Sequence, residues 1–218
     1  MKILGLDFSS AQRSAAVFND EDAVAHQEVD VSPGRDMKPF ALIESALRLA
    51  KLEREEIECI AVGIGPGSYA GIRVAISLAQ GWQLGTGVRL LGISSVAGIA
   101  AQAGADGVSG KFSVAIDALR GEFYLASYET TGRGVTETIP LKLTTLAEAQ
   151  ELERAGELLI GPEATRWFPN GRLIFPHAAM VARLAAQRSD FVAGEKIEPI
   201  YLRETTFVKA PASRAIPL

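Results

Sequence analysis

Two stretches decide the fold, because the second repeats the pattern of the first: Ile3-Leu-Gly-Leu-Asp7-Phe-Ser-Ser-Ala-Gln-Arg-Ser-Ala-Ala-Val-Phe18 and Ser113-Val-Ala-Ile-Asp117-Ala-Leu-Arg-Gly-Glu-Phe-Tyr-Leu-Ala-Ser-Tyr128. They align without a gap. In each, an apolar strand ends in an aspartate, a polar turn follows, and a second strand ends in an aromatic residue. The repeat indicates that the second half of the chain duplicates the first.

The segments that follow these stretches predict the same order of elements in both halves. In the first half we expect strands at 3–6, 14–18 and 23–29, a break at Ser32-Pro33-Gly34, a helix at 36–52, a strand at 59–64, a helix at 71–85 and a strand at 89–93. In the second we expect a third strand at 136–141, a helix opened by the capping box of Thr145 and Glu148, a strand at 158–160 and a helix at 177–188.

This order is typical of ribonuclease-H-like units, two of which face each other across a cleft in actin and the sugar kinases. We therefore predict an α/β fold with two such (actin/ASKHA) lobes, each a mixed sheet with flanking helices. The N-terminal lobe is expected at 1–100 and the C-terminal lobe, with its tail, at 101–218, and the last segment could pack back on the first lobe. The boundary is expected in the Gly/Ala-rich stretch between Gly98 and Gly110.

Composition narrows the function classes. The 218 residues carry a formal net charge of −4, without the basic stripe expected of a protein that binds tRNA by itself. The single cysteine, Cys59, provides neither a disulfide framework nor a cysteine zinc site. No apolar segment is long enough to span a bilayer, and the first residues do not match a signal peptide. We expect a cytoplasmic protein with no membrane contact.

A glycine loop, Gly65-Pro66-Gly67-Ser68-Tyr69-Ala70-Gly71, lies between a predicted strand and a predicted helix. It lacks the lysine of a phosphate-binding Walker A loop. It fits the dinucleotide fingerprint formally, but no acidic residue follows the next strand to bind a ribose. The remaining interpretation is structural, with Gly65, Gly67 and Gly71 permitting a tight turn and close packing. The residues favour this last interpretation.

Asp7 and Asp117 end equivalent strands, so we expect them to face each other near the cleft. With Ser9 and Ser10 they form a candidate nucleotide site, where paired acids would organise Mg²⁺ as in a phosphotransferase or ATPase. The alternative is that each aspartate only caps a turn. Asp7 is followed by Phe8-Ser9-Ser10 rather than by glycine, which weakens the kinase interpretation.

The histidines are only two, and their placement argues against a metal centre. His26 and His177 lie far apart and match no His-Glu-x-x-His or His-x-x-x-His pattern. We therefore predict no metal ligands and give a metallopeptidase little weight.

The two predicted helices of the first half carry more apolar surface than one core needs. Gly71, Ala75 and Ala79 also form a row of small residues that would permit close helix approach. Either neighbouring segments cover both faces, or a partner does, and a homodimer and a heterodimer would look alike. We expect a partner interface that contains Phe40, Ile43, Leu47, Ile72, Ala75, Ile76, Ala79 and Trp82.

The chain resembles the TsaB (YeaZ) family over nearly its whole length, and five segments carry the resemblance. The segments are Ile3-Leu4-Gly5-Leu6-Asp7, the loop from Gly65 to Arg73, Ala79-Gln80-Gly81, the block from Ala115 to Tyr124, and Pro199-Ile200-Tyr201-Leu202-Arg203. The glycine loop and the Asp117 block together are specific to the family. Pro-x-Tyr-Leu-Arg alone would be modest support.

The resemblance implies a role in making the tRNA modification threonylcarbamoyladenosine (t6A). The family belongs to the ASKHA superfamily and is related to TsaD, which transfers threonylcarbamoyl to adenosine beside the anticodon of certain tRNAs. TsaD holds its metal with a His-x-x-x-His helix. The corresponding helix here begins Arg35-Asp36-Met37-Lys38-Pro39 and has neither histidine. The implied protein is a non-catalytic, degenerate paralogue that activates TsaD.

The resemblance also implies partners. Family members pair with TsaD, or with themselves when alone, through the helices at 36–52 and 71–85. The larger complex contains the ATPase TsaE, and tRNA reaches this chain only through the complex. The chain has no cofactor of its own, although ATP or ADP with Mg²⁺ can bind at the complex interface. Related sequences have been labelled glycoprotease-like, an activity that the missing metal ligands do not favour.

Overall fold

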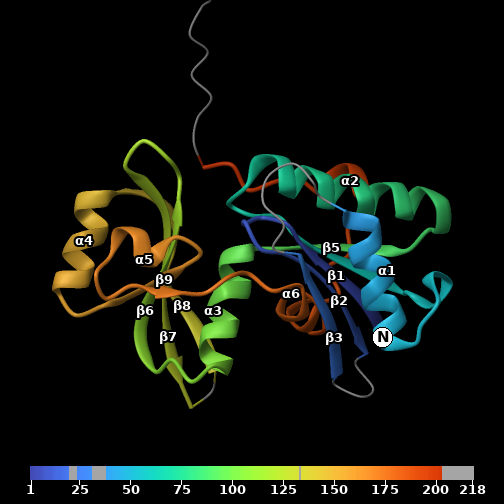
Figure 1. Ribbon diagram of the computed structural model, residues 1–218, viewed down its shortest axis with the longest axis horizontal. Helices are drawn as coiled ribbons and strands as arrows, with labels where there is room; N and C mark the ends of the chain where they lie inside the picture. The colour runs from blue at the N-terminus through green and yellow to red at the C-terminus, as the bar shows by residue number, and fades with distance from the viewer. Residues whose placement is uncertain (20–23, 31–37, 133, 203–218) are drawn as a thin grey trace, which may run out of the picture.

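The computed structural model describes residues 1–19, 24–30, 38–132 and 134–202 (Figure 1). Two sheets lie side by side, with helices between and around them (Figure 1). Within the described ranges, none of the helices combines the length and the apolar character that crossing a membrane would need. The expected break at Ser32-Pro33-Gly34, the first two residues of the helix predicted at 36–52, and the residues after 202 fall outside these ranges.

The first sheet has the strand order β3-β2-β1-β4-β5. Its strands are β1 (Lys2–Asp7), β2 (Arg13–Asn19), β3 (Val24–Asp30), β4 (Cys59–Gly63) and β5 (Arg89–Ile93). β1 and β2 pair antiparallel, as do β2 and β3, whereas β1, β4 and β5 run parallel. The register places Asp7 directly opposite Ser14. This is the mixed sheet that the sequence predicts.

The second sheet repeats the first strand for strand, in the order β8-β7-β6-β9-β10. Its strands are β6 (Gly110–Asp117), β7 (Glu122–Thr131), β8 (Gly134–Thr145), β9 (Leu158–Gly161) and β10 (Arg172–Leu173). β6-β7 and β7-β8 are antiparallel, and β6-β9 and β9-β10 are parallel. The duplication inferred from the two aspartate-ending hairpins is therefore confirmed at the level of topology.

Three helices follow the strands of each half. They are α1 (Pro39–Ala50), α2 (Tyr69–Thr86) and α3 (Ser95–Ala105), then α4 (Leu146–Arg154), α5 (Ala164–Trp167) and α6 (Ala178–Ala186). α1 begins with a proline, which suits the first helical position, and ends where Lys51 turns left-handed at φ 54°. α2 begins two residues before the predicted start, because Ser68 caps it by accepting from the Gly71 amide. The predicted capping box of α4 is present.

The third helix of each half packs against the sheet of the other half. α3 packs on β6, β7 and β8, and α6 packs on β1, β2 and β4. Sequence reasoning missed α3, because its Gly/Ala-rich composition resembled a linker. The predicted boundary at residue 100 falls inside this helix. The two packed units therefore do not correspond to two consecutive pieces of the chain, because α3 and α6 each pack on the sheet of the other half.

Both faces of the first sheet are covered by helices. Leu4, Leu6 and Ile60 join the core under α1 and α2, whereas Ile3 and Cys59 join the core under α6. Alternate residues of one strand thus enter different cores, as the two-residue period of a strand requires. The segment after α6 returns along this sheet, where Val192 bridges to Leu90.

Replacing Ile60 with alanine should lower the free energy of unfolding by about 2–5 kcal/mol, because its fully buried side chain would leave a cavity under α1 and α2. Chemical denaturation measured by circular dichroism tests this. Leu84→Ala is the control, since Leu84 is 89% exposed and should change stability by less than about 0.5 kcal/mol. Equal losses in the two variants would contradict the assignment of the core.

Candidate functional site

Asp7 is a fully buried carboxylate whose oxygens are both bonded within the protein. One oxygen accepts from the Ser9 amide at 2.9 Å and from the Ser9 hydroxyl at 2.6 Å. The other accepts from the hydroxyl of Ser95 at 2.7 Å. Burial raises the pKa of Asp7 above its ordinary value, and these hydrogen bonds oppose that shift. Three protein donors thus engage both oxygens of this carboxylate.

The Asp7–Ser14 pair fixes both helices that cross between the sheets. Ser95, which donates to Asp7, is the first residue of α3. Ser14, opposite Asp7 in the hairpin, accepts from the amide of Ala178, the first residue of α6, at 2.8 Å. Sequence reasoning missed Ser14 and Ser95. The only local sign in the sequence is the Ser94-Ser95 pair that directly follows β5, where a dinucleotide-binding site would have an acidic residue.

The glycine loop closes directly onto the turn after Asp7. The Ser68 amide donates to the Ser9 carbonyl at 2.7 Å. Gly67 has φ +148°, and a Cβ there would lie 2.1 Å from the Ser9 carbonyl oxygen. A Cβ on Gly71 would lie 1.9 Å from the Phe8 carbonyl oxygen, so neither glycine can be replaced without moving backbone. Gly65, with φ +87°, begins the turn. This geometry agrees with the structural interpretation of the loop.

The candidate nucleotide residues therefore divide into two sets with different surroundings. Asp7, Ser9 and Ser10 are buried at the end of β1. Asp117 is partly exposed at the end of β6, where its Oδ1 accepts from the Leu119 amide at 2.7 Å. The hydrogen bonds of Asp7 go to Ser9 and Ser95, and that of Asp117 comes from Leu119, so these bonds do not connect the two aspartates. Their predicted pairing around a nucleotide stays a prediction.

Asp117 has a carboxylate neighbour that the sequence did not suggest. The backbone amide of Asp117 donates to the Glu163 side chain, and burial raises the pKa of Glu163. Among the residues that the structure describes, the buried Glu163 Oε2 has no hydrogen-bond partner. Across the described residues, no three histidine, cysteine, aspartate or glutamate side chains are grouped so that they could hold a metal ion.

His177 lies where the chain enters α6, between acidic residues of different elements. Burial lowers its pKa below the ordinary value of 6.5, while Asp106 at the end of α3 and Asp7 of β1 oppose the shift. The other histidine, His26, is on β3, where it pairs with Val17 of β2. The two histidines thus belong to separate elements, a strand and a helix start.

The structure corrects the residues assigned to a partner interface. Six of the eight are at most 5% exposed, because they face the first sheet and form its core: Ile43, Leu47, Ile72, Ala75, Ile76 and Ala79. Ala75 and Ala79 are fully buried, so a charge at either would enter the core, whereas Ile43 also lines the groove described below. The small-residue row lets α2 approach the sheet rather than another protein. Phe40 and Trp82 are the two that reach the surface.

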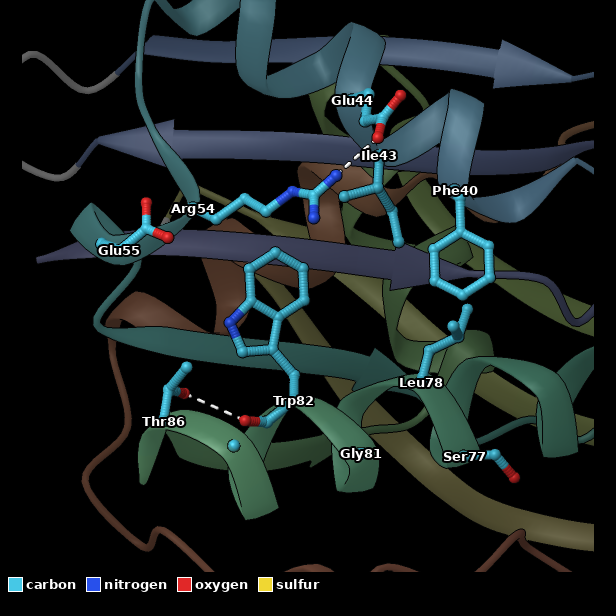
Figure 2. Close-up of a pocket in the computed structure, with 11 residues that line it drawn as sticks. Phe40, Ile43, Glu44, Arg54, Glu55, Ser77, Leu78, Gly81, Trp82 and Thr86 are labelled. Atoms are coloured by element: carbon cyan, nitrogen blue, oxygen red, sulfur yellow. Dashed lines mark hydrogen bonds and ion pairs between the residues drawn. The ribbon is translucent and has the colours of Figure 1, made fainter.

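Phe40 and Trp82 belong to an apolar groove between α1 and α2 (Figure 2). Phe40 and Ile43 of α1 face Leu78 and Trp82 of α2 across it (Figure 2). The groove has a volume of about 460 Å³. Its end beside Trp82 carries charge, where Arg54 forms an ion pair with Glu44. The remaining lining residues are Glu55, Ser77, Gly81, Gly85 and Thr86.

The two helices that form this groove also carry large exposed apolar side chains. Phe40 is 66% exposed, and Leu49, Tyr69 and Leu84 on the same two helices are also exposed. Single exposed apolar residues are common, but a gathered set is typical of an interaction surface. The helix pair that the sequence selected therefore carries an exposed apolar groove, lined mostly by residues outside the predicted set.

Comparison with known proteins identifies relatives over most of the chain. The family model described as TsaD, tRNA N6-adenosine threonylcarbamoyltransferase, matches residues 40–203. The tRNA threonylcarbamoyladenosine biosynthesis protein TsaB of Escherichia coli (strain K12) is 27% identical over 220 residues, covering 93% of this chain and 95% of that protein. TsaB of Bacillus subtilis (strain 168) is 24% identical over 152 residues, covering 70% of this chain and 66% of that protein.

A solved structure shows the same fold. YeaZ from Pseudomonas aeruginosa matches with a TM-score of 0.77 and 22% sequence identity, over 92% of this chain and 99% of that chain. A second structure from the same organism, titled as a protein with similarity to the peptidase YeaZ, has a TM-score of 0.76 and 23% identity. The match covers 93% of this chain and 99% of that chain.

Replacing Asp7 with alanine should lower the free energy of unfolding by at least about 2 kcal/mol, because three buried donors lose their acceptor at about 1–3 kcal/mol each. Asp117→Ala is the matched control. Its carboxylate is partly exposed, so the loss should stay below about 1 kcal/mol. Denaturant titrations measure both variants, and a reversed order would contradict the anchoring role of Asp7.

Acidification should destabilise the chain partly through His177. Its folded pKa lies below 6.5, so the unfolded chain takes up the proton first as the pH falls through that value. The free energy of unfolding should therefore decrease as the pH drops from about 7 to the pKa of His177 in the folded chain. His177→Gln should show a smaller loss of thermal stability between pH 7.5 and 5.5. Parallel curves for the two proteins would refute this contribution.

Proposed function

Because the chain belongs to the TsaD family, and within it to the TsaB/YeaZ group of the ASKHA-like superfamily, we propose that it is a non-catalytic subunit in tRNA threonylcarbamoyladenosine biosynthesis. In this proposal it binds TsaD through the groove between α1 and α2 and stabilises the active conformation of that enzyme. The observation that carries the proposal is the exposed apolar groove on the helix pair that the family resemblance assigns to pairing.

The groove suits a helix with an apolar stripe. Phe40 stands exposed on one wall, and Leu78 and the half-buried Trp82 lie on the other (Figure 2). Complete burial of one such side chain contributes about 1.5–3 kcal/mol to association. Tryptophan is also enriched among the residues that dominate binding energy. Leu78 and Trp82 pack against the core under α1 and α2.

Two features support a role without chemistry of its own. The chain's two histidines, His26 and His177, lie on β3 and before α6, far from the helical His-x-x-x-His arrangement that the family resemblance assigns to TsaD. The acid at the position of a kinase metal ligand, Asp7, is committed to Ser9 and Ser95. The phosphotransferase alternative would have to break this network to use Asp7.

The tRNA, nucleotide and TsaE are expected to meet this chain only in the assembled complex. The net charge of −4 does not favour tRNA binding by the isolated chain, because phosphate contacts need a cationic surface. Nucleotide with Mg²⁺ at the contact with TsaD remains part of the proposal. A cytoplasmic location is part of it too.

Replacing Phe40 or Trp82 with alanine should weaken the binding of the cognate TsaD at least about tenfold, because each removes a large apolar contact at the groove. Isothermal titration calorimetry with the purified proteins measures this. Leu173→Ala, an exposed apolar residue on β10 of the second sheet, is the control and should bind as the unchanged chain does.

A second test of the proposed function measures tRNA modification by TsaD. TsaD should modify tRNA in a reconstituted reaction when this chain is added, and much less with Trp82→Ala at a concentration that saturates with the unchanged chain. Equal modification with and without the chain would refute the proposed function. Magnesium-dependent ATP turnover by the isolated chain, lost in Asp7→Ala, would favour the phosphotransferase instead.

A further inference from the structure

Three surface side chains from distant parts of the chain pack into one cluster, which we call the Tyr–Arg cluster: Tyr69, Arg73 and Tyr201. The Arg73 guanidinium carbon lies 4.3 Å from the centre of the Tyr69 ring. The Nε of Arg73 donates to the Tyr201 hydroxyl at 3.2 Å, and the two tyrosine rings are 6.0 Å apart. Two weak contacts and one hydrogen bond thus order all three side chains together.

Tyr201 reaches this place because the end of the described chain is fastened along α2. We call residues 192–202 the strap. The Gly194 carbonyl accepts from Gln80 at 2.9 Å, and the Gly194 amide donates to Gln83 at 2.7 Å. Further on, the Ile200 amide donates to the Ile64 carbonyl at 2.9 Å. The strap is therefore held at both ends before Tyr201 meets Arg73.

The core of the first sheet secures the strap between these hydrogen bonds. Ile197 is buried among the residues under α1 and α2. The polypeptide leading to Tyr201 thus belongs to the packed body of the protein. A side chain presented from such a support has a defined position.

The Tyr–Arg cluster is ordered and yet accessible. Tyr69 is 58% and Tyr201 is 52% exposed, and Arg73 is exposed as well. A free arginine loses side-chain entropy worth up to about 2 kcal/mol when a partner immobilises it. Here the two tyrosines restrict Arg73 in advance, so less is lost on binding. Tyrosine and arginine are also the residue types enriched at binding hot spots.

The Tyr–Arg cluster adjoins the groove. Arg73 lines a shallow hollow with Phe40, Ser77 and Leu78. The last three of these residues also line the groove itself. One continuous surface therefore runs from Trp82 past Leu78 and Phe40 to Arg73, and the strap forms its far end.

We propose that the strap completes the TsaD-docking surface, with the Tyr–Arg cluster as its polar end. This inference rests on the proposed function and adds a segment outside the helix pair to that site. The partner it fits is a helix whose apolar residues enter the groove and whose acidic side chain meets Arg73. The bond to Tyr201 uses Nε, so the terminal nitrogens of Arg73 are placed to donate to a carboxylate.

Calorimetric titration with cognate TsaD tests the proposal. Tyr201→Ala and Arg73→Ala should each weaken binding at least about tenfold, because tyrosine and arginine are typical hot-spot residues. Tyr201→Phe keeps the ring and loses only the hydroxyl bond, so its loss should be smaller, about threefold or less. The affinity of the Arg73→Ala variant for TsaD should also depend less on salt concentration, because the variant cannot form the proposed ion pair. Leu173→Ala again serves as the control.

The outcomes separate this inference from the proposed function. If Phe40→Ala weakens binding but Tyr201→Ala and Arg73→Ala do not, the strap is not part of the site and the groove remains. If the unchanged chain does not bind TsaD, the proposed function itself fails. Should Tyr201→Ala unfold, Arg73→Lys carries the test. Lysine keeps the charge but not the planar stack, so unchanged affinity would overturn the proposal.

Discussion

The hydrogen bonds of Asp7 are the constraint on which the rest of this molecule depends. This carboxylate binds its own turn through Ser9 and the start of α3 through Ser95. Its cross-strand neighbour Ser14 binds the start of α6. One cross-strand pair in one hairpin is therefore bonded to the first residues of both crossing helices. Removing a buried acceptor of this kind is costly because every donor that it served becomes unsatisfied.

The same arrangement is consistent with the proposed docking role. An aspartate at the end of β1 could face a ligand, but here protein donors occupy it, and the glycine loop closes on the same turn through Ser68 and Ser9. Burial also favours the neutral form of Asp7. The polar interior thus holds the frame together. The proposed function assigns recognition to the apolar groove between α1 and α2.

The sequence predicted the frame better than the site, for physical reasons. The repeat of Asp7 and Asp117 predicted both sheets, because strand order follows from local pattern and duplication. Ser95 was missed because it meets Asp7 across 88 positions of sequence, which no local pattern reveals. Ala75 and Ala79 were misplaced because a helix that is apolar on several faces does not disclose which face meets its own sheet. Only the tertiary packing separates core from surface there.

The exchange of α3 and α6 between the two halves has a consequence for how the chain is made. β1 to β5 emerge early from the ribosome, but α6 at 178–186 covers one face of their sheet. Until that helix is synthesised, Ile3 and Cys59 lack their apolar cover. Contacts between such distant segments slow folding, because long loops must close before they are formed. Nascent chains of this protein would therefore expose apolar surface until late in translation. Chaperones would be most needed during that period.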